Sequence, residues 1–183
     1  MGVYLTEVAW FVARPLTNLV WGGVFERHPT LRVAITEGTC SWAPEMLKLM
    51  DLRYEHGMED QKLGDYRSHL SLKPSEYFRR NVALGASCVR RSEVDQRHAI
   101  GVETIMWGTD FPHPEGSWPH THDEMREVFT GLPEDEVAAM LGGNAARFYG
   151  MDTEKLAPLV ARIGPKKSDF RGEPPELLGT RAS

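Results

Sequence analysis

Cysteine, clustered basic charge and long apolar runs are all scarce in this 183-residue chain. The two cysteines, Cys40 and Cys88, are too few for a disulfide framework, and their spacing fits no zinc motif. Lys and Arg never occur more than two in a row, and the formal net charge is −5. A nucleic-acid-binding surface needs a concentrated basic patch, so we expect no nucleic-acid partner and little attraction to an anionic membrane.

The N-terminal residues, MGVYLTEVAWFVARPL, lack the basic start of a signal peptide, and Glu7 and Arg14 interrupt their apolar stretch. We therefore expect neither a signal peptide nor a membrane span. Hydrophobic residues make up 41% and charged residues 26% of the chain, which is ordinary for a soluble globular protein. Together with the few cysteines, this composition predicts one cytoplasmic domain with a substantial core.

Helical and strand patterns alternate along the chain. Apolar residues at steps of three and four predict a helix over 3–27, kinked or split at Pro15. Further helices are predicted over about 42–57, 89–99, 121–129 and 133–141, and strands over 31–38, 81–87 and 102–110. Alternation of this kind implies right-handed crossovers and a parallel sheet, so the predicted fold class is α/β.

Local signals set the expected boundaries. Residues 57–75 are polar and predict a long loop, and Thr121–Glu124 matches a helix capping box. The glycines and asparagine at 142–144 should break the following helix. We expect the domain to cover residues 1–152 and residues 153–183 to form a C-terminal tail, of which the last 25 or so residues are loosely ordered.

Functional groups of parallel α/β folds collect at the C-terminal ends of the strands. The three predicted strands end in Thr36-Glu37-Gly38, Ser87-Cys88 and Gly108-Thr109-Asp110. An acid that follows apolar strand residues is costly unless it is paired, hydrogen-bonded or bound to a metal. Asp110 is therefore a candidate metal ligand or general base, with a turn acid or helix cap as the alternative.

The other candidates each leave two interpretations open. Glu37 is a functional acid or the ion-pair partner of an arginine such as Arg79 or Arg80. His113 stands between two prolines, which present an imidazole on a rigid loop, or it is a hydrogen-bonded loop histidine. Cys88 is a nucleophile or, since no histidine is placed beside it, a small core residue.

Four segments carry a resemblance that covers about residues 3–152: GGVFERHPTLRVAITEG, PSEYFRRNV, IMWGTDFPHPEGSWPH and LPEDEVAAMLGGNAARFYGMD. They resemble, in order, the C-terminal part of the amidohydrolase-related family, which includes the aminocarboxymuconate-semialdehyde and γ-resorcylate decarboxylases. The resemblance implies a partial (β/α)8 TIM barrel, with strands six to eight and their helices. It also implies a divalent metal, expected to be zinc, at the C-terminal ends of the strands.

The resemblance implies roles for four residues. Asp110 would be the eighth-strand aspartate, which binds the metal or activates its water. Glu37 stands where the decarboxylases carry a catalytic histidine, and it would contact substrate or relay a proton. His113 and Trp118 would shape the pocket for a small carboxylated or carbonyl substrate. Whether the reaction is hydrolysis or non-oxidative decarboxylation stays open.

Parts of the family pattern are missing. No predicted strand carries the first-strand metal motif (His or Glu, one residue, then His), and the strand-five histidine is also absent. One carboxylate and a loop histidine are too few ligands for tight zinc binding. The expected metal therefore belongs to the complete barrel, and its absence from this chain alone is the alternative. Such a barrel needs roughly 250 residues.

We therefore expect the C-terminal segment of an enzyme that is incomplete as it stands. The alternative is a catalytically inactive half-barrel that acts as an interaction or structural module, for example by forming a homo-oligomer. Two structural expectations follow. Glu37 and Asp110 should lie at the same end of the sheet, and the chain should expose an unusually large apolar surface because part of the barrel is missing.

Overall fold

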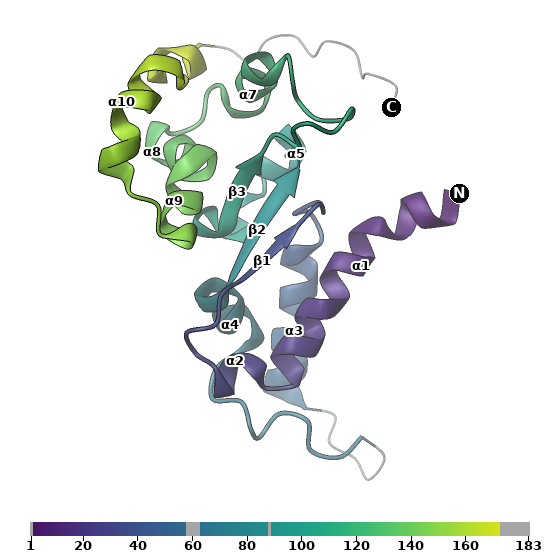
Figure 1. Cartoon of the computed structure of the whole chain (residues 1–183). Helices are drawn as coiled ribbons and strands as arrows, with labels where there is room; N and C mark the ends of the chain where they lie inside the picture. Colours follow the sequence, from purple (N-terminus) through teal and green to yellow (C-terminus); the bar gives the residue numbers. More distant parts are fainter. Residues whose placement is uncertain (1, 58–62, 88, 173–183) are drawn as a thin grey trace.

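The computed structural model describes residues 2–57, 63–87 and 89–172, without the side chains of 4–6 and 8–10. Its centre is a parallel three-stranded sheet in the order β1-β2-β3. The strands are β1 (Val33–Thr36), β2 (Val82–Ser87) and β3 (Ile105–Gly108). All three arrows point the same way in Figure 1, with helices on both sides of the sheet. The prediction of an α/β fold with parallel strands is confirmed.

The register of the sheet places the strand ends side by side. Thr36 of β1 pairs with Gly85 of β2, and Ser87 of β2 pairs with Gly108 of β3. Strand β2 is central and almost wholly buried, as expected for a parallel strand covered on both faces. Because the strands are parallel, the residues that follow β1 and β3 lie at the same end of the sheet. Glu37 and Asp110 are therefore at the same end, as predicted.

Two helices precede β1, namely α1 (Gly2–Trp21) and α2 (Val24–Arg27). Helix α1 continues through Pro15, so the expected split at this proline is wrong. The break lies at Gly22 and Gly23, where Gly23 has a φ of +64° and a Cβ would meet the His69 ring at 2.9 Å. Glycine takes this left-handed conformation without the steric penalty of other residues.

Between β1 and β2 the structure places α3 (Ala43–His56) and α4 (Pro74–Asn81). Helix α3 agrees with the prediction, whereas α4 is missing from it. Eight residues give too short an apolar period to stand out, but α4 buries Tyr77 and Phe78 completely. Its start is recognisable afterwards, because Pro74 occupies the first turn and the Glu76 carboxylate accepts a hydrogen bond from the Lys73 N–H at 2.8 Å.

The segment before β3 differs from the single helix predicted over 89–99. It forms two short helices, α5 (Arg91–Val94) and α6 (Arg97–Ile100), and a 3-10 turn, η1 (Val102–Thr104). After β3 the chain forms α7 (Thr121–Phe129), α8 (Glu134–Ala138), the π-helix η2 (Ala139–Gly143) and α9 (Asn144–Tyr149).

Two predicted signals in this part of the chain are wrong. The expected break at 142–144 is instead a π turn that leads directly into α9, and it brings Asn144 into the interior. The capping box is also absent, because the N-cap of α7 is His120 and carries no side-chain cap hydrogen bond. Thr121 lies inside the helix, and its hydroxyl is 3.0 Å from the Ser117 hydroxyl.

The predicted loose order of the tail is wrong for its described part. Residues 153–172 contain α10 (Thr153–Ile163) and the 3-10 helix η3 (Lys167–Phe170), and Asp152 caps α10 by accepting the Lys155 N–H at 3.1 Å. Helix α10 buries none of its residues. It covers a cavity of about 760 Å³ beside α8 and α9, with apolar lining that includes Leu132, Val137, Leu141, Met151, Leu156 and Val160. Residues 173–183 lie outside the described structure, and the division at residue 152 stays a prediction.

The hydrophobic core lies between the sheet and the helices. Its largest fully buried side chains include Phe25, Tyr77, Phe78 and Phe129. Large apolar side chains also remain exposed, most clearly on α10, where Leu159, Val160 and Ile163 are on the surface. These side chains belong to the segment after residue 152, and the expectation of an unusually large apolar surface on the barrel segment stays a prediction. Within the part of the chain that the structure describes, no helix is both long and apolar enough to cross a membrane.

Candidate functional site

The loop that follows β3 is closed by its own backbone. The Ser117 N–H donates to the Thr109 carbonyl at 2.9 Å, and the His113 N–H donates to the Asp110 carbonyl at 2.7 Å. Gly116 completes the turn by donating to the His113 carbonyl at 3.0 Å. A Cβ on Gly116 would lie 2.7 Å from the Thr109 carbonyl oxygen. The loop therefore needs glycine here in order to hold residues 110–115 together.

The two acids at the strand ends share an unusual backbone conformation. Asp110 has a φ of +57° and Glu37 a φ of +55°, and no other non-glycine residue in the described ranges has a positive φ. An L-residue in the left-handed region costs about 1–2 kcal/mol. Such strain persists where the surrounding structure imposes it, and it clusters at functional sites.

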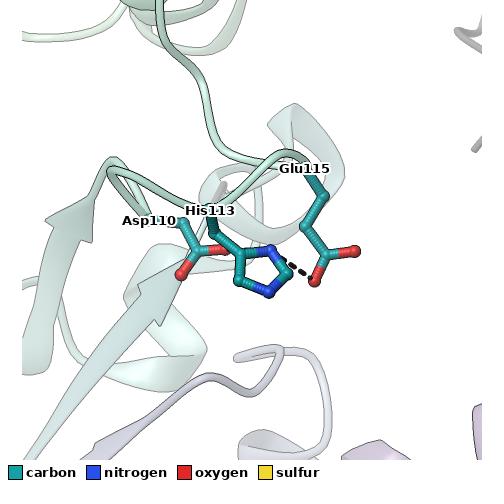
Figure 2. Close-up of side chains that lie close together, drawn as sticks. All are labelled: Asp110, His113 and Glu115. Carbon is teal, nitrogen blue, oxygen red and sulfur yellow. Dashed lines mark ion pairs between the residues drawn. The ribbon is translucent and has the colours of Figure 1, made fainter.

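Asp110, His113 and Glu115 form a cluster at the end of β3. His113 Nδ1 lies 3.7 Å from Asp110 Oδ2 and 3.3 Å from Glu115 Oε1. One ligand atom from each residue falls within 4.8 Å of the others. Figure 2 shows the imidazole between the two carboxylates, beyond the end of the strand. The Asp110 side chain is 22% exposed, whereas His113 and Glu115 face solvent.

The donor set fits a divalent metal ion. Catalytic zinc sites use three nitrogen or oxygen ligands and leave a further position open, and the same donors also suit manganese. Two carboxylates and one imidazole supply that number from a single loop. Glu115 was not predicted, and the sequence estimate of one carboxylate plus one histidine was one ligand short. The spacing Asp-x-x-His-x-Glu within a glycine-closed loop is the signal that could have revealed it.

Trp118 and Glu37, the other predicted site residues, are not part of this cluster. Trp118 is 68% exposed and packs edge-to-face against Phe111, with ring centroids 6.2 Å apart. Glu37 is exposed directly after β1. Among the described residues it forms no ion pair with Arg79 or Arg80, so that alternative is wrong.

A buried acid that sequence reasoning missed supports the segment after Glu37. Glu93 is 4% exposed, and its carboxylate accepts hydrogen bonds from the N–H groups of Cys40 at 2.5 Å, Ser41 at 3.1 Å and Arg90 at 3.1 Å. Burial raises the pKa of the Cys40 thiol well above its usual range, and the negative charge of Glu93 raises it further. Cys40 is therefore a neutral thiol. Cys88 lies outside the described residues.

One further histidine pair has the spacing of a metal motif. His120 and His122 are separated by one residue, but they lie at the start of α7 and both are exposed. Neither belongs to the cluster of Asp110, His113 and Glu115. The spacing alone therefore does not identify a first-strand metal motif.

Comparison with known proteins gives a family match. The sequence profile of the amidohydrolase family matches residues 12–151. The chain is 27% identical over 159 residues to the 2-amino-3-carboxymuconate-6-semialdehyde decarboxylase of Dictyostelium discoideum, an alignment that covers 80% of this chain and 40% of that protein. The crystal structure of 5-carboxyvanillate decarboxylase from Sphingomonas paucimobilis is similar, with a TM-score of 0.58 and 29% identity, over 73% of this chain and 38% of that one.

A second solved structure shares the fold. The dihydroxybenzoic acid decarboxylase of Polaromonas sp. JS666, crystallised with manganese and the inhibitor 2-nitroresorcinol, has a TM-score of 0.56 and 19% identity. The match covers 74% of this chain and 39% of that one. At this identity the likeness concerns the fold alone. The chain thus spans about 40% of the length of the curated relative and a similar share of the solved structures.

Proposed function

The chain belongs to the amidohydrolase family, and from this premise we propose that it carries part of the active site of a metal-dependent enzyme that acts on a small carboxylated compound. The single observation that supports this most strongly is the cluster of Asp110, His113 and Glu115 at the carboxyl end of a parallel strand. Decarboxylation is the favoured reaction, and hydrolysis the second, because the named relatives are decarboxylases.

We further propose that β1, β2 and β3 correspond to strands six, seven and eight of a (β/α)8 barrel. The remaining strands would come from polypeptide outside these 183 residues. The parallel order and the position of both strained acids at one end support this assignment. Residues 1–152 would then form the C-terminal segment of the barrel, with 153–183 as its extension.

Asp110, His113 and Glu115 would hold the metal through two carboxylate oxygens and one imidazole nitrogen. A bound divalent ion supplies a Lewis acid that polarises a carboxylate or carbonyl of the substrate. Zinc is the expected ion, and manganese suits the same donors. Neutral imidazole is the form that binds metal, so His113 would exchange its contacts with the two carboxylates for a bond to the ion.

The residues of this chain also handle protons in the proposed reaction. Decarboxylation replaces a carboxylate by a proton on the same carbon, so a proton donor must reach that carbon. Asp110 is the partly buried acid of the cluster, and its carboxylate oxygen that is not on the metal would take a proton from solvent and pass it to this carbon or, in a hydrolysis, accept one from water. Glu37 would contact the substrate or relay the proton from the neighbouring strand end, and Trp118 would cover the substrate.

Metal binding by the 183-residue chain tests the proposal without an activity assay. Free Mn²⁺ gives an electron paramagnetic resonance signal that disappears on binding, so a titration reports affinity directly. We expect one Mn²⁺ per chain, and Asp110→Asn should weaken binding by about tenfold or more because a charged ligand is lost. Asp123→Asn, an equal charge change on α7, is the control. Equal affinities of both variants would contradict the proposed site.

Activity is measured on an enzyme that contains this segment. Release of CO₂ from 5-carboxyvanillate is the probe for decarboxylation, because the similar structure from Sphingomonas paucimobilis is named for that compound. Metal binding without CO₂ release would keep the site and exclude this substrate. The absence of both metal binding and CO₂ release would exclude the enzyme proposal for this chain.

The second candidate function is an inactive half-barrel that associates with itself. The exposed apolar side chains of α10, which include Leu159, Val160 and Ile163, favour it. Sedimentation equilibrium separates the two candidates. A homo-oligomer that is broken by Val160→Asp and binds no Mn²⁺ would support the interaction module, whereas a monomer that binds Mn²⁺ would support the enzyme segment.

A further inference from the structure

The amino end of the sheet is held by a buried asparagine at the last residue of α4. Asn81 is 1% exposed, and its amide nitrogen donates to the carbonyls of Pro29 at 3.0 Å and Leu31 at 2.7 Å, just before β1. Its side-chain oxygen accepts a hydrogen bond from Arg80 Nε at 2.9 Å. Asn81 therefore links the segment just before β1 to α4 and orients the guanidinium of Arg80.

The same arrangement occurs a second time at the first residue of α9. Asn144 is 2% exposed, and its amide nitrogen donates to the carbonyls of Val102 and Ile105, both at 2.7 Å. Its side-chain oxygen accepts a hydrogen bond from Arg147 Nη2 at 2.9 Å. Two buried asparagines thus hold two arginines in fixed orientations at the entries of β1 and β3.

These residues line a pocket of about 220 Å³. Four arginines line it, namely Arg32, Arg79, Arg80 and Arg147, together with one acid, Glu103. Four positive charges and one negative charge leave the lining at +3, although the whole chain carries −5. Positive charge is therefore concentrated here against the trend of the protein.

The arginines of this pocket are bonded to neutral oxygens. Arg32 Nη1 donates to the carbonyls of Arg147 at 3.1 Å and Phe148 at 3.3 Å. Arg147 Nη2 also donates to the Glu103 carbonyl at 3.0 Å. In the described part of the chain none of the four arginines forms an ion pair with a carboxylate.

Arg80 and Arg79 are the two arginines of this pocket that lie on α4. Arg80 Nη2 donates to the Phe25 carbonyl at 2.7 Å, and the charge of Arg80 is the smallest of the causes that lower the pKa of Glu26. The side chain of Arg79 forms no hydrogen bond or ion pair with any described residue. A guanidinium has five N–H donors, so each of these side chains keeps donors free for a ligand.

We propose that this pocket binds a phosphate group. Its volume is below the range of about 300–1,000 Å³ that is typical of drug-sized ligands, so it suits a small oxyanion. Guanidinium groups match the oxygens of phosphate in paired hydrogen bonds, and a charge near −2 complements a lining of +3. The two asparagines orient Arg80 and Arg147 in advance, which reduces the entropy lost on binding. The site lies at the end of the sheet opposite the candidate metal centre and is independent of the proposed function.

Calorimetric titration of inorganic phosphate into the full 183-residue chain, at an ionic strength matched with chloride, tests the site. We expect saturable binding of one phosphate per chain. Arg79→Gln should weaken it by at least about tenfold, because a charge-assisted bond is lost. The Arg79 side chain makes no hydrogen bond or ion pair within the described structure, so this variant should fold and melt as the parent does. Arg14→Gln, the same change on α1, is the matched control and should bind phosphate as the parent does.

A second titration with methyl phosphate separates the two sources of the group. Tighter binding of the ester points to a phosphorylated metabolite, and tighter binding of inorganic phosphate points to the free ion. Phosphate should also raise the melting temperature of the parent by mass action, and raise that of Arg79→Gln less. No heat beyond the chloride control, equal affinities of Arg79→Gln and the parent, or an equal loss in Arg14→Gln would overturn the proposal.

Discussion

The two ends of the parallel sheet differ in backbone strain and in the hydrogen bonding of their polar side chains. At the carboxyl end, Asp110 and Glu37 are acids on strained left-handed backbone, and their side chains reach solvent. At the amino end, Asn81 and Asn144 are buried, and each satisfies two backbone carbonyls and one arginine. Backbone strain thus lies at the end of the sheet where we propose that ligands bind, and fully satisfied hydrogen bonding lies at the end where the strands begin.

The sign of the charge also reverses from one end to the other. Glu37, Asp110 and Glu115 place negative charge around the carboxyl end, while arginines gather at the amino end. A carboxylated substrate would be repelled by three acids, whereas a divalent cation among them would reverse the local sign. The comparison therefore strengthens the case that the carboxyl end works with a metal ion.

The largest expected effect is on activity at the carboxyl end. In an enzyme that contains this segment, Asp110→Asn should lower turnover by about 10²–10⁴-fold, because the charge that acts as ligand or base is lost. The melting temperature should barely change, since Asn tolerates the left-handed conformation and keeps the shape of Asp. Turnover, metal content and thermal melting of the variant are measured beside the parent. Full turnover with full metal content would reduce Asp110 to a turn residue.

The next effect is on stability at the amino end. Asn144→Ala should lower the free energy of unfolding by roughly 2–4 kcal/mol, because the carbonyls of Val102 and Ile105 lose their donor in a buried place. Mn²⁺ affinity of the folded chain should not change. Denaturant unfolding with a parallel Mn²⁺ titration checks both statements. Asn18→Ala, at an exposed asparagine of α1, is the control and should stay within about 0.5 kcal/mol.

The contrast between these ends also separates what the sequence could predict from what it could not. The strands were found because apolar β-branched runs are local signals, and the position of Glu37 and Asp110 at one end follows from parallel order alone. The asparagine contacts could not be found in this way. Asn144 bonds to residues about forty positions earlier in the chain, and no local pattern encodes such a contact.

Local signals failed where tertiary packing overrode them. The glycines at 142 and 143 suggested a break, but burial of Asn144 favours a π turn that continues the helical path. Two of the three residues of the candidate cluster were predicted from the sequence. Asp110 and His113 stood out by their positions, whereas Glu115 was not predicted, because only the closure of the loop through Gly116 brings it beside His113.

The strain at the carboxyl end can be measured at Glu37. Glu37→Gly and Glu37→Ala both remove the acid, but only glycine relieves the positive φ. The glycine variant should therefore be more stable than the alanine variant by about 1 kcal/mol, measured by denaturant unfolding. Both variants should lose turnover alike if Glu37 contacts the substrate. Equal stability of the two would show that the backbone at Glu37 is not strained.

The smallest effect concerns pH near the amino end. Glu26 of α2 is half-buried, and its carboxylate accepts hydrogen bonds from the Tyr77 hydroxyl and from the hydroxyl and N–H of Ser71. The Tyr77 bond is the main cause that lowers the pKa of Glu26 below its ordinary value of 4.5, with Ser71 next. Burial and, next, the hydrogen bond to Glu26 raise the pKa of Tyr77, which keeps its hydroxyl a donor.

Because the folded-state pKa of Glu26 is the lower one, the unfolded chain binds this proton first as the pH falls. The stabilisation is therefore complete above pH 4.5 and is lost as the pH drops from 4.5 through the folded-state pKa. Glu26→Gln should flatten the pH dependence of unfolding in that window and leave it unchanged at neutral pH, as measured by denaturant unfolding at a series of pH values. The same substitution at exposed Glu7 is the control. A slope below pH 4.5 that is the same in Glu26→Gln as in the parent would show that this carboxylate does not couple the fold to pH.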